Sequence, residues 1–497
     1  MQKILIVFLF LISNFYLSSC TSSLWLTKYD QKVNKLNEQI NFLISDPSLH
    51  NAHIGIYIEA LKDGRVLYAR NPFKLMIPAS NMKLFTTAAA LIKLGPAFKF
   101  TTQITYTGSI KDSILYGNLL IKGSGDPSIS GRFYGGDRLA VFKQWADSLK
   151  SRGIREIKGQ IIGDARLFKA PKLAEGWNWD DESFWYAAKI SALAYNDNCV
   201  DLAIFPDSLA GKTVQVRLFP EYSKVKIINK AITVDRPGQA ELKISRLQGK
   251  NTIVIEGAMS VNADTVRESI TVENVDQFFL DILAQTFEQQ GIELSSGVRL
   301  LNEEETFPED SLKMLFSFHS PPLSEIIKVI NKRSHNFYTE QLLKTMGAVF
   351  KGEGSFEAGA AVVREFLNSI GVADEHFINV DGSGLSRKNF VAPIATATLL
   401  RYMYYHPDFQ YYLNSLPAAG IDGTISDRMI GTRAQGKVHA KTGYVGHVRA
   451  LSGYVNPEGK NPLLFVLMFN NYSVPTPKIN LIQDKIAILL TEFSMTP

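Results

Sequence analysis

The spacing of hydrophobic and polar positions along this 497-residue chain predicts strands and helices in a definite order. Alternating apolar residues at 53–68 flank the turn-forming pair Asp63-Gly64, which is typical of a β-hairpin. An apolar run at 80–94, entered after Pro78, has the character of a helix. The last third predicts helices at 323–330, 337–350 and 479–493, and strands at 437–441, 448–455 and 463–469. This order indicates an α+β fold in which one antiparallel sheet packs between helices.

The middle of the chain has a different pattern. It consists of short alternating runs rich in β-branched residues, with one helical pattern at 275–290. The runs lie at 101–107, 113–121, 213–219, 225–234, 241–246 and 252–256. We therefore expect a β-rich insertion at 98–305, in one or two subdomains, which divides an α+β domain formed by residues 29–97 and 306–497.

Composition narrows the class of protein. A hydrophobic content of 45% argues for a folded chain and against disorder, and the length predicts two or three domains. The net charge of +5 is spread without a basic tract, so nucleic acid is not an expected partner.

The first residues read as a secretory signal. Lys3 precedes a continuous apolar run at 4–12, which is too short to favour a spanning helix. The segment ends in Leu-Ser-Ser-Cys at 17–20, and small residues directly before a cysteine are similar to a bacterial lipobox. We expect residues 1–19 to be removed. The alternative is an ordinary signal peptide that ends near a cysteine by chance.

A lipid anchor would then be attached to Cys20. Residues 20–28 would form the tether between this anchor and the folded protein. Cys199, the other of the two cysteines, would have no partner, so no intrachain disulfide is expected. Thr21 is not the aspartate that retains lipoproteins in some inner membranes, which favours the outer membrane in a cell with two membranes.

Three short motifs carry the candidate chemistry. They are S-N-M-K at 80–83, S-H-N at 334–336 and K-T-G at 441–443, and K-T-G occurs once in the chain. The pattern S-x-x-K recurs at 223–226 and S-x-N at 260–262, so each pattern alone is weak. Their order along the chain is what makes them informative.

Local context separates the two S-x-x-K copies. Ser80 and Lys83 belong to a predicted helix, where side chains three residues apart share a face. Ser223 opens a predicted strand, where positions three apart point to opposite faces. Taken alone, Ser80 could be a helix cap and Lys83 a solvated surface residue. With the other two motifs in order, they predict a nucleophile and its base.

Together the motifs supply a complete acyl-transfer site: a serine nucleophile, an amine base, a relay hydroxyl and a Lys-Thr pair that can bind a carboxylate. Such a site needs no metal and no cofactor. The histidines lack metal-ligand spacing and there is no cysteine pair, so we expect no metal site.

The order of these motifs resembles that of the penicillin-recognising serine enzymes. Ser334 lies much further from Ser80 than from Lys441, which leaves room for the insertion. This is similar to the D-alanyl-D-alanine carboxypeptidase/endopeptidases of the penicillin-binding protein 4 type, peptidase family S13, whereas compact β-lactamases have no such insertion. Further stretches that resemble this family lie at 123–128, 163–168, 381–387 and 416–424. The resemblance implies a penicillin-binding, β-lactamase-like α+β domain.

It also implies a role for each motif residue. Ser80 would attack the carbonyl of a terminal D-Ala-D-Ala bond, and Lys83, neutral because of burial and a nearby Lys441, would be its base. Ser334 would pass a proton to the leaving nitrogen. Asn336 would orient Lys83 and bind the substrate amide.

The third motif would hold the other end of the substrate. Lys441 and Thr442 would bind its carboxylate, and Gly443 would leave room for a peptide along the strand edge. The backbone N–H groups of Ser80 and Tyr444 would form the oxyanion hole. Many relatives have threonine or serine where Tyr444 stands, which adds a carboxylate contact, so the strength of carboxylate binding is left open by this residue.

Other residues have two interpretations each. By resemblance, Asp164 and Arg387 would bind the zwitterionic end of a diaminopimelate side chain; the alternative is that both are surface residues in turns. His335 is expected to be structural. The aromatic residues at 177–179 and 184–186 could cover a glycan or peptide, but packing is the favoured use.

The motifs and the resemblance together imply an exported, periplasm-facing lipoprotein with D-Ala-D-Ala carboxypeptidase activity on peptidoglycan stem peptides, and they leave open an additional endopeptidase activity on peptide cross-links. β-Lactam antibiotics would be covalent inhibitors, and membrane contact would be through the lipid anchor alone. One alternative is a β-lactamase or esterase of the same superfamily. Another is a non-catalytic lipoprotein that binds peptidoglycan.

Overall fold

The computed structural model describes residues 28–235 and 241–495. The predicted signal peptide and the lipidation of Cys20 fall outside the described residues. The chain forms two compact units. The first consists of the described residues up to Met76 with Ala392–Arg401 and Pro417 onwards, and the second of Ile77–Val391 with Tyr402–Leu416. The predicted domain boundaries, at 97/98 and 305/306, stay a prediction.

The first unit is built on one antiparallel sheet of five strands in the order β2-β1-β23-β22-β21. Its strands are β1 (His53–Ala60), β2 (Val66–Arg70), β21 (Val438–Val445), β22 (Val448–Val455) and β23 (Leu463–Asn470). The central strand β23 is buried at every position, because it is apolar and covered on both faces. Strand β21 lies at an edge of the sheet.

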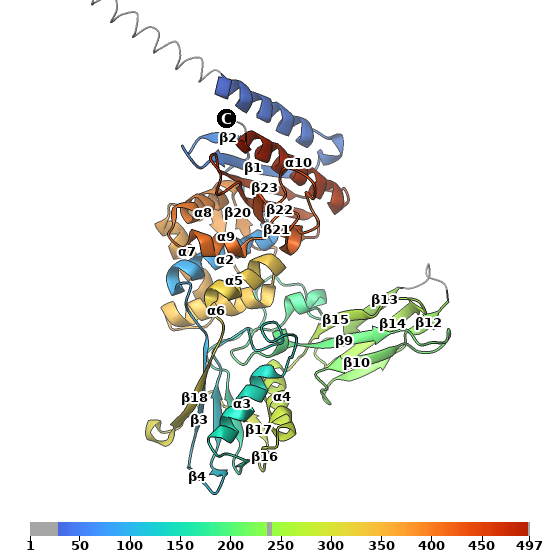
Figure 1. The fold of residues 1–497 in the computed structure, drawn as a ribbon, viewed down its shortest axis with the longest axis vertical. Helices are drawn as coiled ribbons and strands as arrows, with labels where there is room; N and C mark the ends of the chain where they lie inside the picture. The colour runs from blue at the N-terminus through green and yellow to red at the C-terminus, as the bar shows by residue number, and fades with distance from the viewer. Residues whose placement is uncertain (1–27, 236–240, 496–497) are drawn as a thin grey trace, which may run out of the picture. The chain divides into compact units, whose positions relative to one another are not determined.

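Apolar helix faces cover this sheet. A helix over residues 28–44 and the C-terminal helix α10 (Thr476–Met495) share a buried core with the strands (Figure 1). Helix α8 (Pro393–Tyr405) lies partly in this unit, where the Arg401 Nε donates to Glu59 Oε1 of β1 at 2.6 Å. The predicted arrangement of one antiparallel sheet with helices is therefore present.

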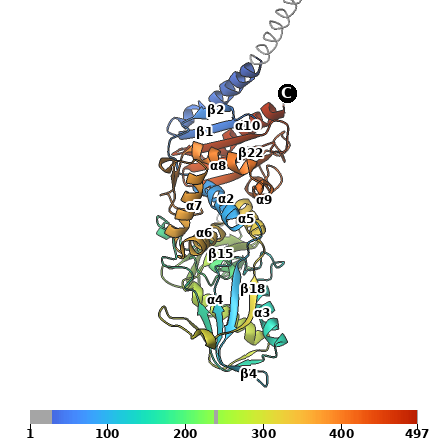
Figure 2. The same cartoon turned by 90° about the vertical axis from the view of Figure 1, so that its left-hand side faces the viewer.

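The second unit contains a group of helices. They are α2 (Met82–Leu94), α5 (Leu323–Arg333), α6 (Asn336–Lys351), α7 (Phe356–Ser369) and α9 (Phe409–Ser415), which lie together in both views (Figures 1 and 2). Buried polar bonds tie them: Asn331 Nδ2 donates to Thr87 Oγ1 at 3.2 Å and to Ser415 Oγ at 2.8 Å. Helix α2 is thereby fixed against α5 and α9.

The rest of this unit is rich in strands, as the insertion pattern predicts. A five-stranded sheet has the order β17-β8-β6-β3-β18, and three smaller sheets are β16-β7-β5-β4, β10-β9-β15 and β11-β14-β12 with β13 beside β14. All four sheets share one buried core with helices α3 (Ala140–Ser151) and α4 (Val275–Gln289).

The strands of these sheets have the following bounds: β3 Thr101–Tyr106, β4 Ser109–Lys111, β5 Ile114–Tyr116, β6 Leu119–Lys122, β7 Glu156–Ile157, β8 Ile161–Asp164, β9 Cys199–Phe205, β10 Gln215–Phe219, β11 Lys226–Asn229, β12 Ile232–Val234, β13 Leu242–Arg246, β14 Thr252–Ser260, β15 Val266–Thr271, β16 Glu293–Leu294, β17 Val298–Leu300 and β18 Lys313–His319. A separate pair, β19 (Phe377–Ile378) and β20 (Phe390–Val391), brackets the loop at 379–389.

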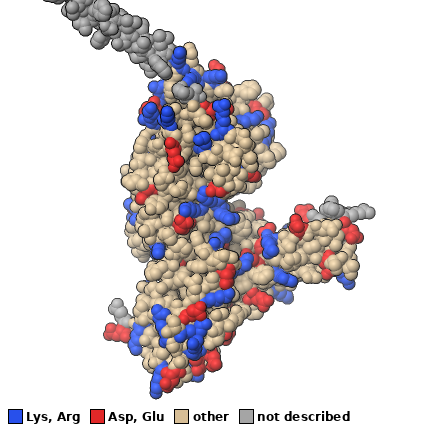
Figure 3. Space-filling model, viewed as in Figure 1, with Lys and Arg blue, Asp and Glu red and all other residues tan. Residues whose placement is uncertain are grey.

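Three surface and chemical properties complete the fold. Basic and acidic side chains are interspersed over the face shown in Figure 3. In the two described ranges, no helix combines the length and apolar character required to cross a bilayer. Cys199 is a free, buried thiol.

Candidate active site

Ser80 lies in a tight turn rather than in the helix itself. The turn η2 (Ala79–Asn81) leads directly into α2, and Lys83 stands in the first turn of that helix. The predicted helix at 80–94 therefore starts two residues late. The apolar residues of α2 pack into the core, so Lys83 is fully buried while Ser80 keeps partial exposure.

Lys83 Nζ has three oxygen neighbours. It lies 3.0 Å from Ser80 Oγ, 2.6 Å from Asn336 Oδ1 and 2.8 Å from the Ser383 carbonyl oxygen. A protonated amine can donate to all three. A neutral amine has two N–H groups, and since the amide and carbonyl oxygens only accept, these two take both donors. The lone pair is then left facing the Ser80 hydroxyl, as a general base requires.

The protonation of Lys83 is set by its surroundings. Burial lowers its pKa to about 7, while the carboxyl groups of Glu340 and Asp381 act in the opposite direction. The cause of the lowering is therefore desolvation. The expected contribution of Lys441, which belongs to the first unit, stays a prediction.

Asn336 has a fixed orientation. It begins α6, and its Nδ2 donates to the Tyr186 carbonyl oxygen at 2.8 Å, which turns Oδ1 toward Lys83. Ser334, two residues earlier, ends α5 in the left-handed region with φ 55°. The turn between the two helices thus places the amide of this motif beside the amine of the first.

A loop at 381–389 provides the third acceptor for Lys83. The Glu340 carboxylate accepts from the backbone N–H groups of Gly382 (2.9 Å) and Ser383 (2.7 Å). Asp381 accepts from the N–H groups of Gly384 and Ser386, each within 2.8 Å. The two buried acids therefore hold the loop that presents the Ser383 carbonyl.

The charge of Asp381 acts on Glu340. Burial, followed by the charge of Asp381, raises the pKa of Glu340 to about 8. Sequence reasoning did not select Glu340, although a glutamate among the apolar residues of a predicted helix is an available signal. The resemblance at 381–387 implies no role for the Ser383 carbonyl.

Close approach makes Gly384 necessary in this loop. It has φ +80°, and a Cβ there would lie 1.8 Å from the Ala79 carbonyl oxygen. The loop can therefore pack against the turn that carries Ser80 only where the side chain is absent.

His335, the middle residue of the second motif, is buried. It is 2% exposed, and its Nε2 lies 3.2 Å from Asp197 Oδ2 and 2.9 Å from an Arg132 nitrogen. Burial lowers its pKa, in opposition to the Asp197 charge. Its ring contacts that of Trp185, with ring centres 5.4 Å apart.

The aromatic residues around 177–186 divide between packing and exposure. Trp177 Nε1 donates to Asp381 Oδ2 at 2.9 Å, and Tyr186 supplies the carbonyl that orients Asn336. Trp179, in contrast, is 72% exposed.

The K-T-G motif lies in the first unit, on edge strand β21. Lys441, Thr442 and Gly443 are buried there, and Thr442 Oγ1 lies 2.7 Å from Thr424 Oγ1. Tyr444 is 55% exposed. The motif is thus on an edge strand, which leaves one side of the strand open for a peptide to lie along it.

Asp164 and Arg387 have different surroundings. Asp164 ends β8, and its two carboxylate oxygens accept from the Arg166 guanidinium at 2.9 and 3.0 Å. Burial alone would raise the pKa of Asp164, but bonds from Arg166 lower it. Arg387 is exposed in the loop at 381–389.

The structure thus brings Ser80, Lys83 and Asn336 into contact, and it pairs Asp164 with Arg166, which was not predicted.

Comparison with known proteins identifies the family. The chain matches the family model "D-Ala-D-Ala carboxypeptidase 3 (S13) family" over residues 36–493. It is 32% identical over 477 residues to a D-alanyl-D-alanine carboxypeptidase of Actinomadura sp., covering 93% of this chain and 86% of the relative. It is 27% identical to the D-alanyl-D-alanine carboxypeptidase DacB of Haemophilus influenzae, with 85% and 86% covered.

The fold has solved counterparts. The crystal structure of penicillin binding protein 4 from H. influenzae aligns with a TM-score of 0.79 at 24% identity, covering 91% of this chain and 99% of that one. The predicted α+β class and the predicted family are therefore confirmed. The chain belongs to the D-Ala-D-Ala carboxypeptidase 3 (S13) family, and its class is that of a serine-type D-Ala-D-Ala carboxypeptidase.

Proposed function

We propose that this enzyme removes terminal D-alanine from peptidoglycan stem peptides, and also cuts peptide cross-links, through an acyl-enzyme on Ser80. The observation that carries the proposal is the 3.0 Å distance between Lys83 Nζ and Ser80 Oγ. The other two acceptors of the amine are Asn336 Oδ1 and the Ser383 carbonyl oxygen. A lysine pKa of about 7 leaves much of the amine neutral at neutral pH.

In the first step Lys83 takes the Ser80 proton as the hydroxyl oxygen attacks the substrate carbonyl. The backbone N–H groups of Ser80 and Tyr444 stabilise the oxyanion. Ser334 then delivers a proton to the leaving nitrogen as the C–N bond breaks. Asn336 keeps Lys83 in position and binds the substrate amide. Water then hydrolyses the Ser80 ester, with Lys83 again the base.

Lys441 and Thr442 bind the carboxylate of the leaving D-alanine, while Gly443 leaves space for the peptide backbone beside β21. Tyr444 stands where many relatives have a threonine or serine that adds a carboxylate contact, and its ring is exposed, so we expect carboxylate affinity to be lower. A β-lactam acylates Ser80 in the same way and remains attached.

Asp164 and Arg387 are proposed to contact a diaminopimelate side chain. Asp164 already accepts two bonds from Arg166, so an ammonium group must share this carboxylate. We further propose that residues 29–97 and 306–497 form the peptidase domain, that 98–305 is inserted, and that Cys20 anchors the exported protein to the membrane.

The test is the intact mass of protein starting at residue 21 after incubation with benzylpenicillin. We expect a lasting adduct of the drug's mass that Ser80→Ala abolishes. Ser223→Ala is the matched control, since it changes the other S-x-x-K serine and should leave the adduct intact. Absence of an adduct with intact drug would contradict the catalytic proposal, and absence with hydrolysed drug would indicate a β-lactamase.

A further inference from the structure

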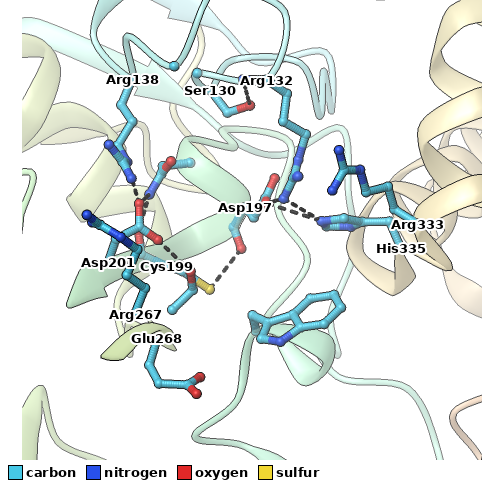
Figure 4. Close-up of a pocket in the computed structure, with 15 residues that line it drawn as sticks. Ser130, Arg132, Arg138, Asp197, Cys199, Asp201, Arg267, Glu268, Arg333 and His335 are labelled. Carbon is cyan, nitrogen blue, oxygen red and sulfur yellow. Dashed lines mark hydrogen bonds and ion pairs between the residues drawn. The ribbon is translucent and has the colours of Figure 1, made fainter. Parts of the chain in front are cut away.

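A cavity of about 560 Å³ lies beside the second motif, within the second unit. Arg333 and His335, the two neighbours of Ser334 in sequence, form part of its wall (Figure 4). Arg267 of β15 forms another part. Its volume is within the range of roughly 300–1,000 Å³ that is typical of ligand sites.

The charged groups of this cavity fall into two kinds. Arg132 is paired with Asp197, and Arg138 with Asp201, so these four groups neutralise one another (Figure 4). Arg267 and Arg333 are exposed, and within the described part of the chain neither has a hydrogen bond or ion pair. Glu268 is the one further acid in the lining. An excess of positive charge is therefore available to a ligand.

Two residues of the lining each have a buried polar atom without a partner among the described residues. Nδ1 of His335 is buried and has no hydrogen-bond partner among the described residues, and the same holds for Oδ1 of Asp197. Buried polar atoms in proteins nearly always have partners, so these two side chains beside the cavity are not fully satisfied by the described residues. Guanidinium groups without an ion pair suit a carboxylate.

We propose that this cavity binds the leaving strand of a peptide cross-link, with Arg267 and Arg333, which lie on opposite sides of it (Figure 4), each binding a carboxylate of that strand. The inference rests on the proposed function, in which Ser334 protonates the leaving nitrogen. The leaving segment must therefore pass Ser334, whose two sequence neighbours line the cavity. A single D-alanine ends at the carboxylate that Lys441 and Thr442 bind. The amine released from a cross-link belongs to a second peptide, which continues beyond this point and carries further carboxylates.

Bond changes are the same for both substrates. The bond between Ser80 Oγ and the carbonyl carbon forms, the C–N bond breaks, and the proton taken by Lys83 reaches the leaving nitrogen through Ser334. The cavity therefore changes which leaving group is accepted, and not the chemistry.

The experiment compares kcat/KM for a cross-linked muropeptide dimer with kcat/KM for the monomeric pentapeptide. We expect Arg267→Gln and Arg333→Gln each to lower the dimer-to-monomer ratio about tenfold, since a bond between charged groups is lost. Arg333→Lys should restore part of the ratio. Arg155→Gln is the matched control, because Arg155 is also exposed, has no ion pair among the described residues and lies outside the cavity lining.

A second readout measures binding without turnover. Calorimetry of the Ser80→Ala protein with the released monomeric peptide should show weaker affinity when Arg267 and Arg333 are both glutamine. An unchanged ratio and affinity in the double variant would overturn the inference, as would failure of the unaltered enzyme to cleave the dimer. Failure of the proposed function is distinguished by loss of benzylpenicillin acylation in the unaltered enzyme.

Discussion

At the scale of single residues, the main result is how Lys83 is prepared to act as a base. Two oxygens that can only accept, from Asn336 and Ser383, occupy both N–H groups of the neutral amine. The serine hydroxyl is the one neighbour of the three that can donate. The geometry thus selects the proton that the amine receives.

This arrangement predicts a pH dependence for acylation. Burial lowers the pKa of Lys83 to about 7, and the protonated amine cannot accept the serine proton. The acylation rate should therefore rise as the pH increases through about 7 and level off above it. Stopped-flow measurement of benzylpenicillin acylation between about pH 5.5 and 9 tests this. A flat profile across this range would contradict the role of Lys83.

Lys83→Met serves as the first control and should lower the acylation rate by about 10²–10⁴-fold, the usual contribution of a general base. Lys344→Met is matched to it. Lys344 is also buried in this unit, its pKa is lowered to about 8 by burial, and its Nζ donates to the Lys169 and Pro171 carbonyl oxygens. This variant should keep the rise near pH 7.

At the scale of elements, the site depends on how a loop and a turn approach each other. Gly384→Ala would introduce a Cβ 1.8 Å from the Ala79 carbonyl oxygen at a residue with φ +80°. We expect the free energy of unfolding to fall by about 2–4 kcal/mol and acylation to slow. Urea denaturation measures the first effect and benzylpenicillin acylation the second.

Gly371→Ala separates the two causes. Gly371 has φ +89°, and no neighbouring atom of the described residues lies within 4 Å of the added Cβ, so this variant carries the backbone strain alone. Its loss should be about 1 kcal/mol with acylation unchanged. Equal effects of the two substitutions would show that close approach at Gly384 is unimportant.

Elements with strong local signals could be predicted from the sequence. The hairpin at 53–68, helix α4 and the C-terminal strands follow from periodicity. Helix α3 was missed, although Val141, Phe142 and Trp145 lie on one buried face, because these residue types also favour strands. The expected strand at 225–234 is two strands, since Asn229 Oδ1 accepts from the Ala231 N–H and turns the chain.

The site could be predicted only where its residues are in motifs. Lys83, Ser80 and Asn336 were named from the sequence, and the structure brings them into contact. The Ser383 carbonyl and the Glu340 carboxylate were not, because backbone acceptors leave no signature and long-range packing decides which loop reaches Lys83. The partner of Asp164, Arg166, is two residues away, and only the backbone conformation reveals their pairing.

At the scale of the whole molecule, the proposed lipid anchor at Cys20 can be tested independently of the active site. If Cys20 carries the lipid, Cys20→Ser should abolish the lipid mass increment and release the protein from membranes. Cys199→Ser is the matched control, since it removes the buried thiol and should keep the increment. Intact mass and fractionation of the expressed full chain provide the readout. If the unaltered protein has no lipid mass increment and is found in the soluble fraction, the ordinary signal peptide is favoured.

The burial of Cys199 determines when the thiol of this residue can be oxidised. Burial, reinforced by the charges of Asp197 and Asp201, raises the pKa of this thiol well above its usual value. Thiolate is the form that reacts with oxidants, so the folded protein is resistant to oxidative coupling even in an oxidising compartment. The unfolded chain lacks this protection and can dimerise through sulfur. Folding before exposure to oxidants therefore determines whether molecules remain single or become covalently linked.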